Sequence, residues 1–461
     1  MADTLSLPRR LTFPHRADTI RAATATEDVT ESRIRLVFGA LLVLAGFVGR
    51  YGVSWDIQWH AMVGRDGFWT PPHIMLYSGS FFVGIFAIIA TLVATARYYR
   101  GEPAASDATL SPVLGFFRAP LGIALTGFGM VATAIAAPLD NYWHTLYGID
   151  VSIWAPFHVM GIFGGCIAHL GVIYLFASEV TRGREREERE GRRFGIRLLG
   201  FRGTEIALTI AVASLLASLY QLIIPAVRGR EAYALFTVAH LSLYTMMTAA
   251  VVPLLLVASA RAIGKPGAAM LIGLWMTVTA IPVAWFVPWA TAMLVQSEGL
   301  QYRQSAPSTI LVTDALPQYL LLTALAVELV FLAARWWERR APYANCTALL
   351  VAGGVATVVN SVLERPWAHP YALRSLGGKS LLTLIGSLPP TEAQQRIAQA
   401  TGKVAGAGNR GRTYADLLKA LASTQEQVNV LIHTVPVALV IGLAAAWLGG
   451  GLGLVLQRLD K

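Results

Sequence analysis

The sequence predicts an all-α polytopic membrane protein, a bundle of about ten transmembrane helices. Three features of the 461-residue chain predict this fold class. Hydrophobic residues make up 55% of the chain and charged residues only 14%, whereas about a quarter of the residues in soluble proteins are charged. Apolar stretches long enough to cross about 30 Å of hydrocarbon recur along the chain. Arg and Lys residues gather in every second segment between these stretches.

The same composition excludes several classes of protein. An ordinary cytosolic enzyme or a disordered chain would carry far more charge. Cys166 and Cys346 both lie in apolar runs, so the sequence predicts no disulfide framework. In a membrane protein, a net charge of +10 more often orients the chain than binds nucleic acid, and no nucleic-acid partner is expected.

We expect one transmembrane helix in each apolar stretch. In the seventh stretch, Pro282 and Pro288 predict a bend or a break, which leaves the number of helices uncertain by one. The stretches are residues 36–55, 73–96, 120–139, 157–179, 204–226, 234–260, 267–294, 313–335, 344–362 and 430–456.

Positive charge predicts the orientation of the bundle, because Lys and Arg cluster on the cytoplasmic side of membrane proteins. The most basic segment, residues 181–203, contains Arg182, Arg184 and Arg186, and the other basic segments fall on the same side. We therefore expect the protein in a bacterial inner or plasma membrane, with its N and C termini in the cytoplasm. A docking segment for a partner protein is the other interpretation of residues 181–203.

These features divide the chain into six segments. Residues 1–35 are polar and lack the apolar core of a secretory signal, so we expect a cytoplasmic tail. Residues 363–429 are too long for a plain connection and predict a small extracytoplasmic cap. The other segments are a duplicated transmembrane unit at 36–180, a basic cytoplasmic loop at 181–203, further helices at 204–362, and the last helix with the C-terminal end at 430–461.

Two segments on the outer side are similar in sequence. The first reads WDIQWHAMVGRDGFWTPPH, residues 55–73, and the second reads LDNYWHTLYGIDVSIWAPFH, residues 139–158. Their agreement at rare residue types predicts an internal repeat made of a helix, a short outer loop and the start of the next helix. The matched pairs are Asp56 and Asp140, Trp59 and Trp143, His60 and His144, Gly64 and Gly148, Asp66 and Asp150, Trp69 and Trp154, Pro71 and Pro156, and His73 and His158.

The spacing within each copy predicts a metal site on the outer face of the membrane. Asp56 and His60 are four residues apart and share one helix face, and His73 follows prolines that suit the first turn of a helix. One carboxylate and two imidazoles suit copper, zinc or iron and leave coordination positions open. The predicted ligands are Asp56, His60 and His73 in the first copy, and Asp140, His144 and His158 in the second.

This pattern resembles a known family. D-x3-H-x12-H at Asp56, His60 and His73 is similar to the metal-binding motif of the C subunit of copper membrane monooxygenases, the particulate methane and ammonia monooxygenases. That family has a second motif, N-x3-H-x13-H, on the following pair of helices. This chain has the same gaps in its second copy, although Asp140 stands where the family has asparagine. The resemblance covers about residues 33–180, and the chain is longer than the family's C subunit.

The resemblance implies a copper-binding enzyme, or a subunit of one, that hydroxylates a small or apolar substrate with O2. Partner subunits would then supply electrons, because no flavin, haem or quinone motif is recognisable; a homo-oligomer is the alternative assembly. Membrane lipid is the other expected partner.

Several alternatives stay open. A transporter for metal ions or protons would use the repeated Asp and His residues as binding sites. A lipid-linked glycosyltransferase would use Asp56 or Asp66 as catalytic base or metal ligand. The two segments are alternatively plain interfacial loops, with Trp and Tyr at headgroup level and His and Asp bonded to backbone.

Three further residues lie within apolar stretches and are candidates for function. Glu205 and Glu328 are intramembrane acids. The partner of Glu328 would be Arg335, a proton or a substrate amine. His169 is either a hydrogen-bonded interior residue or part of a proton relay.

Overall fold

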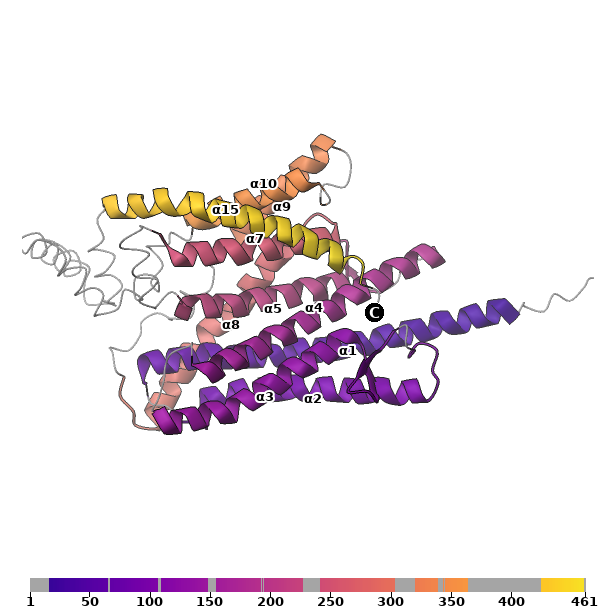
Figure 1. Ribbon diagram of the computed structural model, residues 1–461, viewed down its shortest axis with the longest axis horizontal. Coiled ribbons are helices and arrows are strands. Elements are labelled where there is room, and N and C mark those ends of the chain that lie inside the picture. The colour runs from indigo at the N-terminus through magenta and orange to yellow at the C-terminus, as the bar shows by residue number, and fades with distance from the viewer. Residues whose placement is uncertain are drawn as a thin grey trace, which may run out of the picture.

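A computed structural model of the chain describes residues 16–64, 67–106, 109–147, 155–191, 193, 195–226, 241–302, 320–338, 343, 345–363 and 424–459. Ten α-helices and two β-hairpins are formed within these residues (Figure 1). The helices are α1 (Arg16–Met62), α2 (Pro71–Tyr99), α3 (Leu121–Tyr147), α4 (Pro156–Glu190), α5 (Gly203–Ala226), α7 (Leu243–Ile263), α8 (Ala268–Ser297), α9 (Leu320–Glu338), α10 (Cys346–Leu363) and α15 (Thr424–Leu456). The strands are β1 (Ser111–Val113), β2 (Phe117–Ala119), β3 (Arg197–Leu198) and β4 (Phe201–Arg202).

The all-α membrane fold that the composition predicts is confirmed. Among the described residues, nine helices are long and apolar enough to cross a membrane. The remaining helix, α9, carries Glu328, Arg335 and Glu338 within its 19 residues. Helix α8 continues through Pro282 and Pro288 without a break, as transmembrane helices often do when neighbouring helices support them.

Helices α1 and α4 extend furthest beyond the predicted boundaries. α1 begins at Arg16, inside the segment expected as a tail, and Arg35 Nε donates to Glu31 Oε1 at 2.7 Å one turn away on that helix. α4 continues to Glu190, inside the segment expected as a basic loop, and ends at Gly191 with a left-handed φ of 64°. The pair Glu31–Arg35 in the first extension, and the mixed Arg and Glu residues of the second, are of the kind that stabilises a helix without an apolar stripe.

The helices form two groups joined by α5 and α8. α1 pairs with α2 and α3 with α4, while α7, α9, α10 and α15 pack together on the other side of α5. α8 crosses the bundle obliquely, from α9 to the final turns of α1 (Figure 1). The ends of α1 and α3 lie together at the end of the bundle opposite to the start of α1.

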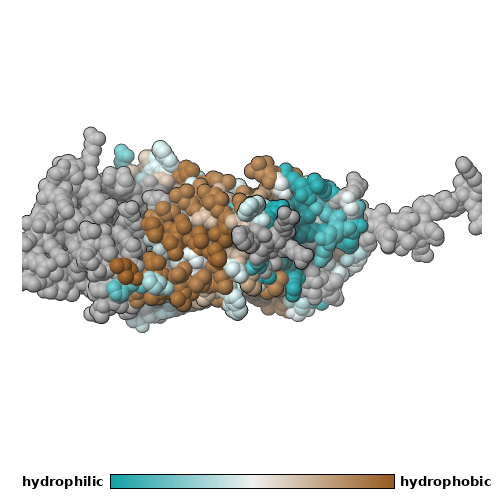
Figure 2. Space-filling model, turned by 90° about the horizontal axis from the view of Figure 1, so that it is seen from above, coloured by the Kyte–Doolittle hydropathy of each residue, from teal (hydrophilic) through white to brown (hydrophobic). Residues whose placement is uncertain are grey.

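The two ends of the bundle differ in polarity. In Figure 2, hydrophobic residues cover the middle of the face shown, and hydrophilic residues gather towards the start of α1. Buried ion pairs occupy this hydrophilic end: the side chain of Arg35, 1% exposed, lies 3.6 Å from Glu179, and Arg97 contacts both Glu31 and Glu102. Helix α15 also ends here. Just beyond it, Gln457 Nε2 donates to the carbonyl oxygen of Arg261, and Thr181 Oγ1 donates to the carbonyl oxygen of Gln457.

Glycine residues bring the paired helices into backbone contact. A Cβ atom added to Gly49 or Gly79 would meet the backbone of the facing helix in the α1–α2 pair, and Gly129 and Gly164 face each other in the same way between α3 and α4. Thr133 Oγ1 donates across this second interface to the carbonyl oxygen of Gly161 at 3.1 Å. Such close approach of small residues is the usual basis of helix packing in membranes.

Each of the helix pairs α1–α2 and α3–α4 is followed by a short β-hairpin, and the two hairpins are similar to each other. β1–β2 follows the first helix pair and β3–β4 follows the second. The turns read LGFFR and LGFR, and in both the leucine has positive φ, 49° at Leu114 and 52° at Leu199. Both leucines are exposed, at 70% and 85% respectively.

Neighbouring glycines in α4 offer a matched test of the close packing. Gly164→Ala places a methyl group 2.5 Å from the carbonyl oxygen of Gly129, whereas Gly165→Ala meets nothing within 4 Å. We expect Gly164→Ala to destabilise the protein by about 1–3 kcal/mol and Gly165→Ala to leave it unchanged or slightly more stable. Thermal unfolding of the purified variants measures this difference. Equal midpoints for the two variants would show that the helices are less tightly packed than described.

Candidate metal centres

The first candidate centre is formed by the end of α1 and the start of α2. Asp56 and His60 lie four residues apart on one face of the last turns of α1. The chain then turns at Gly64, whose φ of 69° is in the left-handed region that favours glycine. Prolines at the first two positions of α2 begin that helix, so His73 lies in its first turn.

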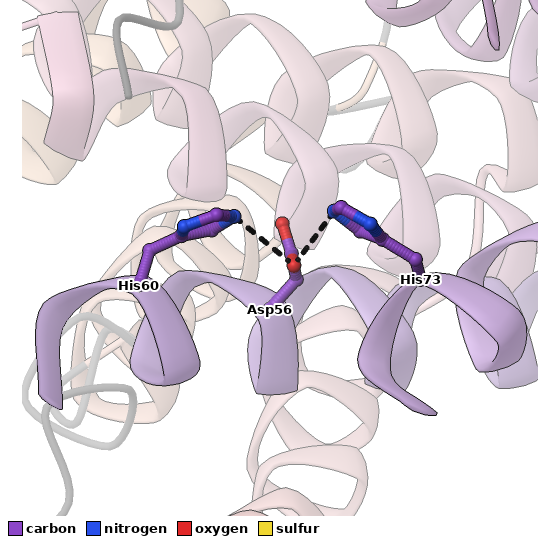
Figure 3. A group of neighbouring side chains, drawn as sticks. All are labelled: Asp56, His60 and His73. Atoms are coloured by element: carbon purple, nitrogen blue, oxygen red, sulfur yellow. Dashed lines mark ion pairs between the residues drawn. The ribbon is translucent and has the colours of Figure 1, made fainter. Parts of the chain in front are cut away.

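The three side chains meet at one carboxylate oxygen (Figure 3). His60 Nε2 lies 3.4 Å from Asp56 Oδ1, and His73 Nε2 lies 3.1 Å from the same atom. The two imidazole rings have centroids 5.9 Å apart and an interplanar angle of 49°. One ligand atom from each residue lies within 4.8 Å of the others, which is close enough for one cation to contact all three.

A hydrogen bond to the backbone fixes the tautomer of neutral His73. Its Nδ1 donates to the carbonyl oxygen of Gly67 at 3.0 Å, and its ring stacks on Tyr77 with centroids 5.6 Å apart. Because a carbonyl oxygen only accepts, Nδ1 carries hydrogen, and in the neutral imidazole Nε2 presents a lone pair to Asp56. Two lone pairs at 3.1 Å repel each other unless a proton or a metal ion lies between them.

The second candidate centre has the same geometry at the end of α3 and the start of α4. His144 Nε2 lies 3.3 Å and His158 Nε2 3.1 Å from Asp140 Oδ2, and the ring centroids are 5.7 Å apart. Pro156 begins α4 and places His158 in its first turn. The other carboxylate oxygen, Asp140 Oδ1, is buried and accepts no hydrogen bond from the described residues. A bound cation would remove the cost of burying that oxygen without a partner.

The surroundings of the two centres differ. α8 packs along the end of α1, where Trp59 is 1% exposed and shares a buried cluster with Val295. At the corresponding end of α3, Tyr142 is 59% exposed. The side chain of His73 is 16% exposed, and that of His158 is 31% exposed. The two centres therefore differ in the exposure of the histidine in the second helix, whereas their other ligands are about equally exposed.

Glu205 and Glu328 have structural partners. Glu205 is fully buried at the hydrophilic end of the bundle, where Lys265 Nζ lies 2.6 Å and Arg184 Nη2 3.6 Å from its oxygens. Glu328 accepts hydrogen bonds from the backbone N–H of Ala269 and from Tyr343, both at 3.3 Å. Glu328 thus caps the start of α8, and Arg335 is not among its described partners.

The remaining histidines and acids are not part of these centres in the described residues. His169 Nδ1 donates to the carbonyl oxygen of Gly165 at 2.8 Å, as expected of a hydrogen-bonded interior histidine. His433, near the start of α15, is exposed. The predicted loop residues Asp66 and Asp150, together with nearly all of the predicted cap at 363–429, lie outside the described residues.

One set of buried polar residues was not singled out in the sequence analysis. Arg50, Ser54 and Gln58 are 5%, 0% and 0% exposed in α1. Their regular spacing of four residues inside an apolar stretch is the signal that predicts a polar face, and it is visible in the sequence alone.

The fold and the two Asp-His-His clusters define an integral membrane protein with two groups of side chains that could each hold a metal ion. No protein family, curated protein or solved structure compared with this chain matches it. The geometry of the clusters and the chemistry of their side chains therefore carry the functional argument.

The number of bound ions tests the two centres. We expect two equivalents of metal in the wild-type protein, one in His60→Ala or His144→Ala, and none in the double variant, because each substitution removes one of three ligands. Elemental analysis of protein purified without chelators gives these numbers. His433→Ala, which removes an exposed imidazole outside both clusters, is the control and should retain two ions. Metal content that is unchanged in the double variant would refute both centres.

The difference in exposure predicts different rates of metal loss. A chelator should remove one ion quickly and the other slowly, because His158 of the second centre is more exposed than its counterpart His73 in the first. In His144→Ala only the slow phase should remain, and in His60→Ala only the fast phase. Stopped-flow measurement with a coloured chelator resolves the two phases. A single phase in the wild-type protein, or the reverse assignment, would contradict this interpretation.

Proposed function

We propose that this protein is a copper-binding membrane protein that takes part in O2-dependent hydroxylation of a small or apolar substrate, as an enzyme or as a subunit of one. The observation that carries the proposal is the pair of imidazole nitrogens facing one carboxylate oxygen at 3.1 and 3.4 Å in the first centre. Its support from sequence is the resemblance of both motifs to those of copper membrane monooxygenase C subunits. The internal duplication of the two helix pairs is part of the same proposal.

The donor set fits copper. Imidazole nitrogen is a preferred ligand of copper, and one carboxylate offsets part of the charge of the ion. Zinc and iron accept the same ligands, and they are the metals against which copper must be compared. Three protein ligands leave coordination positions open, as a site for chemistry requires and a purely structural site does not.

The residues of the chain have separate roles in this proposal. Asp56, His60 and His73 would hold copper in the first centre, and Asp140, His144 and His158 in the second. The hydrogen bond to Gly67 places the hydrogen of neutral His73 on Nδ1, so that Nε2 directs its lone pair at Asp56 and is available to a metal ion. Bound copper would supply one-electron redox chemistry and a binding position for O2.

The apolar surroundings of the first centre suit a small apolar substrate. Trp55 packs against Phe286 of α8 with ring centroids 5.6 Å apart, and Met75 of α2 packs against the same cluster. These side chains exclude water from one side of the centre. Electrons would come from an external donor such as a partner subunit, since nothing in the sequence indicates a second redox group.

We also propose the orientation. The hydrophilic end of the bundle, with Arg35, Arg97, Arg184 and Lys265, would lie in the cytoplasm of a bacterial inner or plasma membrane. Both termini would then be cytoplasmic, and the two metal centres would lie at the outer face.

Incorporation of labelled oxygen tests the proposed reaction. We expect copper-loaded protein in lipid nanodiscs, given ascorbate as a two-electron donor, 18O2 and a small alkane, to place one labelled oxygen atom in the alcohol product, with the other leaving as water. His60→Ala should lower the yield at least about tenfold, because loss of a ligand to a catalytic metal removes well over 1.4 kcal/mol of stabilisation. His433→Ala serves as the control and should keep the activity.

The same preparation distinguishes the alternatives. Copper binding without labelled product across a panel of small apolar substrates would refute the hydroxylation proposal. Copper or proton flux into proteoliposomes that is lost in Asp56→Ala would instead favour a transporter. Transfer of a sugar from a lipid-linked donor that is lost in the same variant would favour a glycosyltransferase.

A further inference from the structure

A stripe of polar side chains lies inside the bundle on one face of α1. Arg50, Ser54 and Gln58 are spaced by four residues, so they lie above one another on the helix. Their side chains are almost completely removed from solvent, with exposed fractions of 5%, 0% and 0%. Arg50 lies well inside the apolar span Val29–His60, about 9 Å along the helix from Asp56 at 1.5 Å per residue.

The stripe lies where α1, α5 and α8 meet. Arg50 Nη2 donates to the carbonyl oxygen of Thr279 in α8 at 3.3 Å, and the hydroxyl group of Tyr51 donates to the same oxygen at 3.4 Å. Gln221 in α5 donates to Ser54 Oγ at 2.6 Å and to the carbonyl oxygen of Arg50 at 3.4 Å. These contacts fix the guanidinium group but give it no negative partner.

Two nitrogens of Arg50 are left over. Nε and Nη1 are buried and donate no hydrogen bond within the described residues, and neither amide atom of Gln58 has a hydrogen-bond partner there. Two arginines at the hydrophilic end pair with carboxylates instead, the buried Arg35 with Glu31 and the partly buried Arg202 with Glu187. The rings of Phe47 and Tyr51, 5.7 and 5.4 Å from the guanidinium carbon, offer it only a weak cation–π contact.

A guanidinium ion in this position needs a negative charge. Arginine remains protonated even when buried, so it cannot escape the cost of desolvation by losing its charge. Charged residues inside a membrane are expensive unless they are paired, and they mark binding sites or pathways. The described residues supply no acid for Arg50, so a bound anion is one source of the missing negative charge.

We propose that Arg50 anchors an intramembrane binding site for an amphiphile whose head carries one negative charge on oxygen, a carboxylate or a phosphodiester. One guanidinium balances one such charge, and its free nitrogens are suited to carboxylate or phosphodiester oxygens. Gln58, about 12 Å further along the same face, offers amide groups to the rest of the ligand. This site does not depend on copper or on the proposed hydroxylation.

Ligand-dependent thermal unfolding of the full-length protein in a neutral detergent tests this site. Decanoate is compared with decanol, and phosphatidylglycerol with phosphatidylcholine, so that each anion has a neutral or zwitterionic counterpart. We expect at least one anion to raise the unfolding midpoint of the wild-type protein in a saturable way, while its counterpart does not. A shift with decanoate alone assigns a carboxylate ligand, and a shift with phosphatidylglycerol alone assigns a lipid headgroup.

Variants at Arg50 separate this site from general effects of charge. Arg50→Met should weaken the binding of the anion about ten- to a hundred-fold, the effect of losing a charged hydrogen bond. It should also raise the midpoint of the ligand-free protein, because it removes a buried charge that has no partner. Arg50→Lys should still respond to the anion, with lower affinity, and the exposed Arg100→Met should respond like the wild type.

Two results would overturn the proposal. One is a wild-type midpoint that neither anion shifts, which would mean that water alone solvates Arg50. The other is an equal shift in the wild type and in Arg50→Met. Neither result bears on the metal content of the two centres, so failure of this site and failure of the proposed function can be told apart.

Discussion

Close contact between glycine backbones is the constraint on which the rest of this structure depends. Gly49 with Gly79, and Gly129 with Gly164, let the helices of each pair approach until backbone touches backbone. Only at that separation can a histidine in the first turn of one helix reach a carboxylate in the last turns of the other. The same contact leaves the helices no room to separate, so the geometry of each cluster is set by the scaffold before any ion binds.

The distribution of charge in the bundle follows from the low dielectric around it. At the hydrophilic end, buried acids and bases are matched, as for Glu205 with Lys265. At the opposite end and in the interior the described charges are less evenly matched: each cluster aspartate faces two histidines, which carry charge only when protonated, and Arg50 faces uncharged groups. Matched charges hold the fold together, whereas unmatched ones identify where a cation or an anion from outside would complete the structure.

Much of the fold and of the clusters could be predicted because their signals are local. Apolar runs gave the helices, the four-residue spacing placed Asp56 beside His60, and the prolines before His73 placed it in a first turn. The partner of Glu328 could not be predicted, because it is the start of α8, distant in sequence. The oblique course of α8 could not be predicted either, because it depends on packing between helices that are not neighbours in sequence. The same holds for Arg50, because its lack of a described acidic partner depends on how α1, α5 and α8 meet.

Packing of α8 against the end of α1 makes the helix pairs α1–α2 and α3–α4 unequal as starting points for protein engineering. Around His60, substitutions must fit against Trp59 and the final turns of α8, so few side chains are tolerated there. Around His144, Tyr142 is 59% exposed, so a substitution there disturbs less packing. The ligand set at the end of α3 can therefore be redesigned while the Asp56 cluster stays unchanged as a reference in the same molecule.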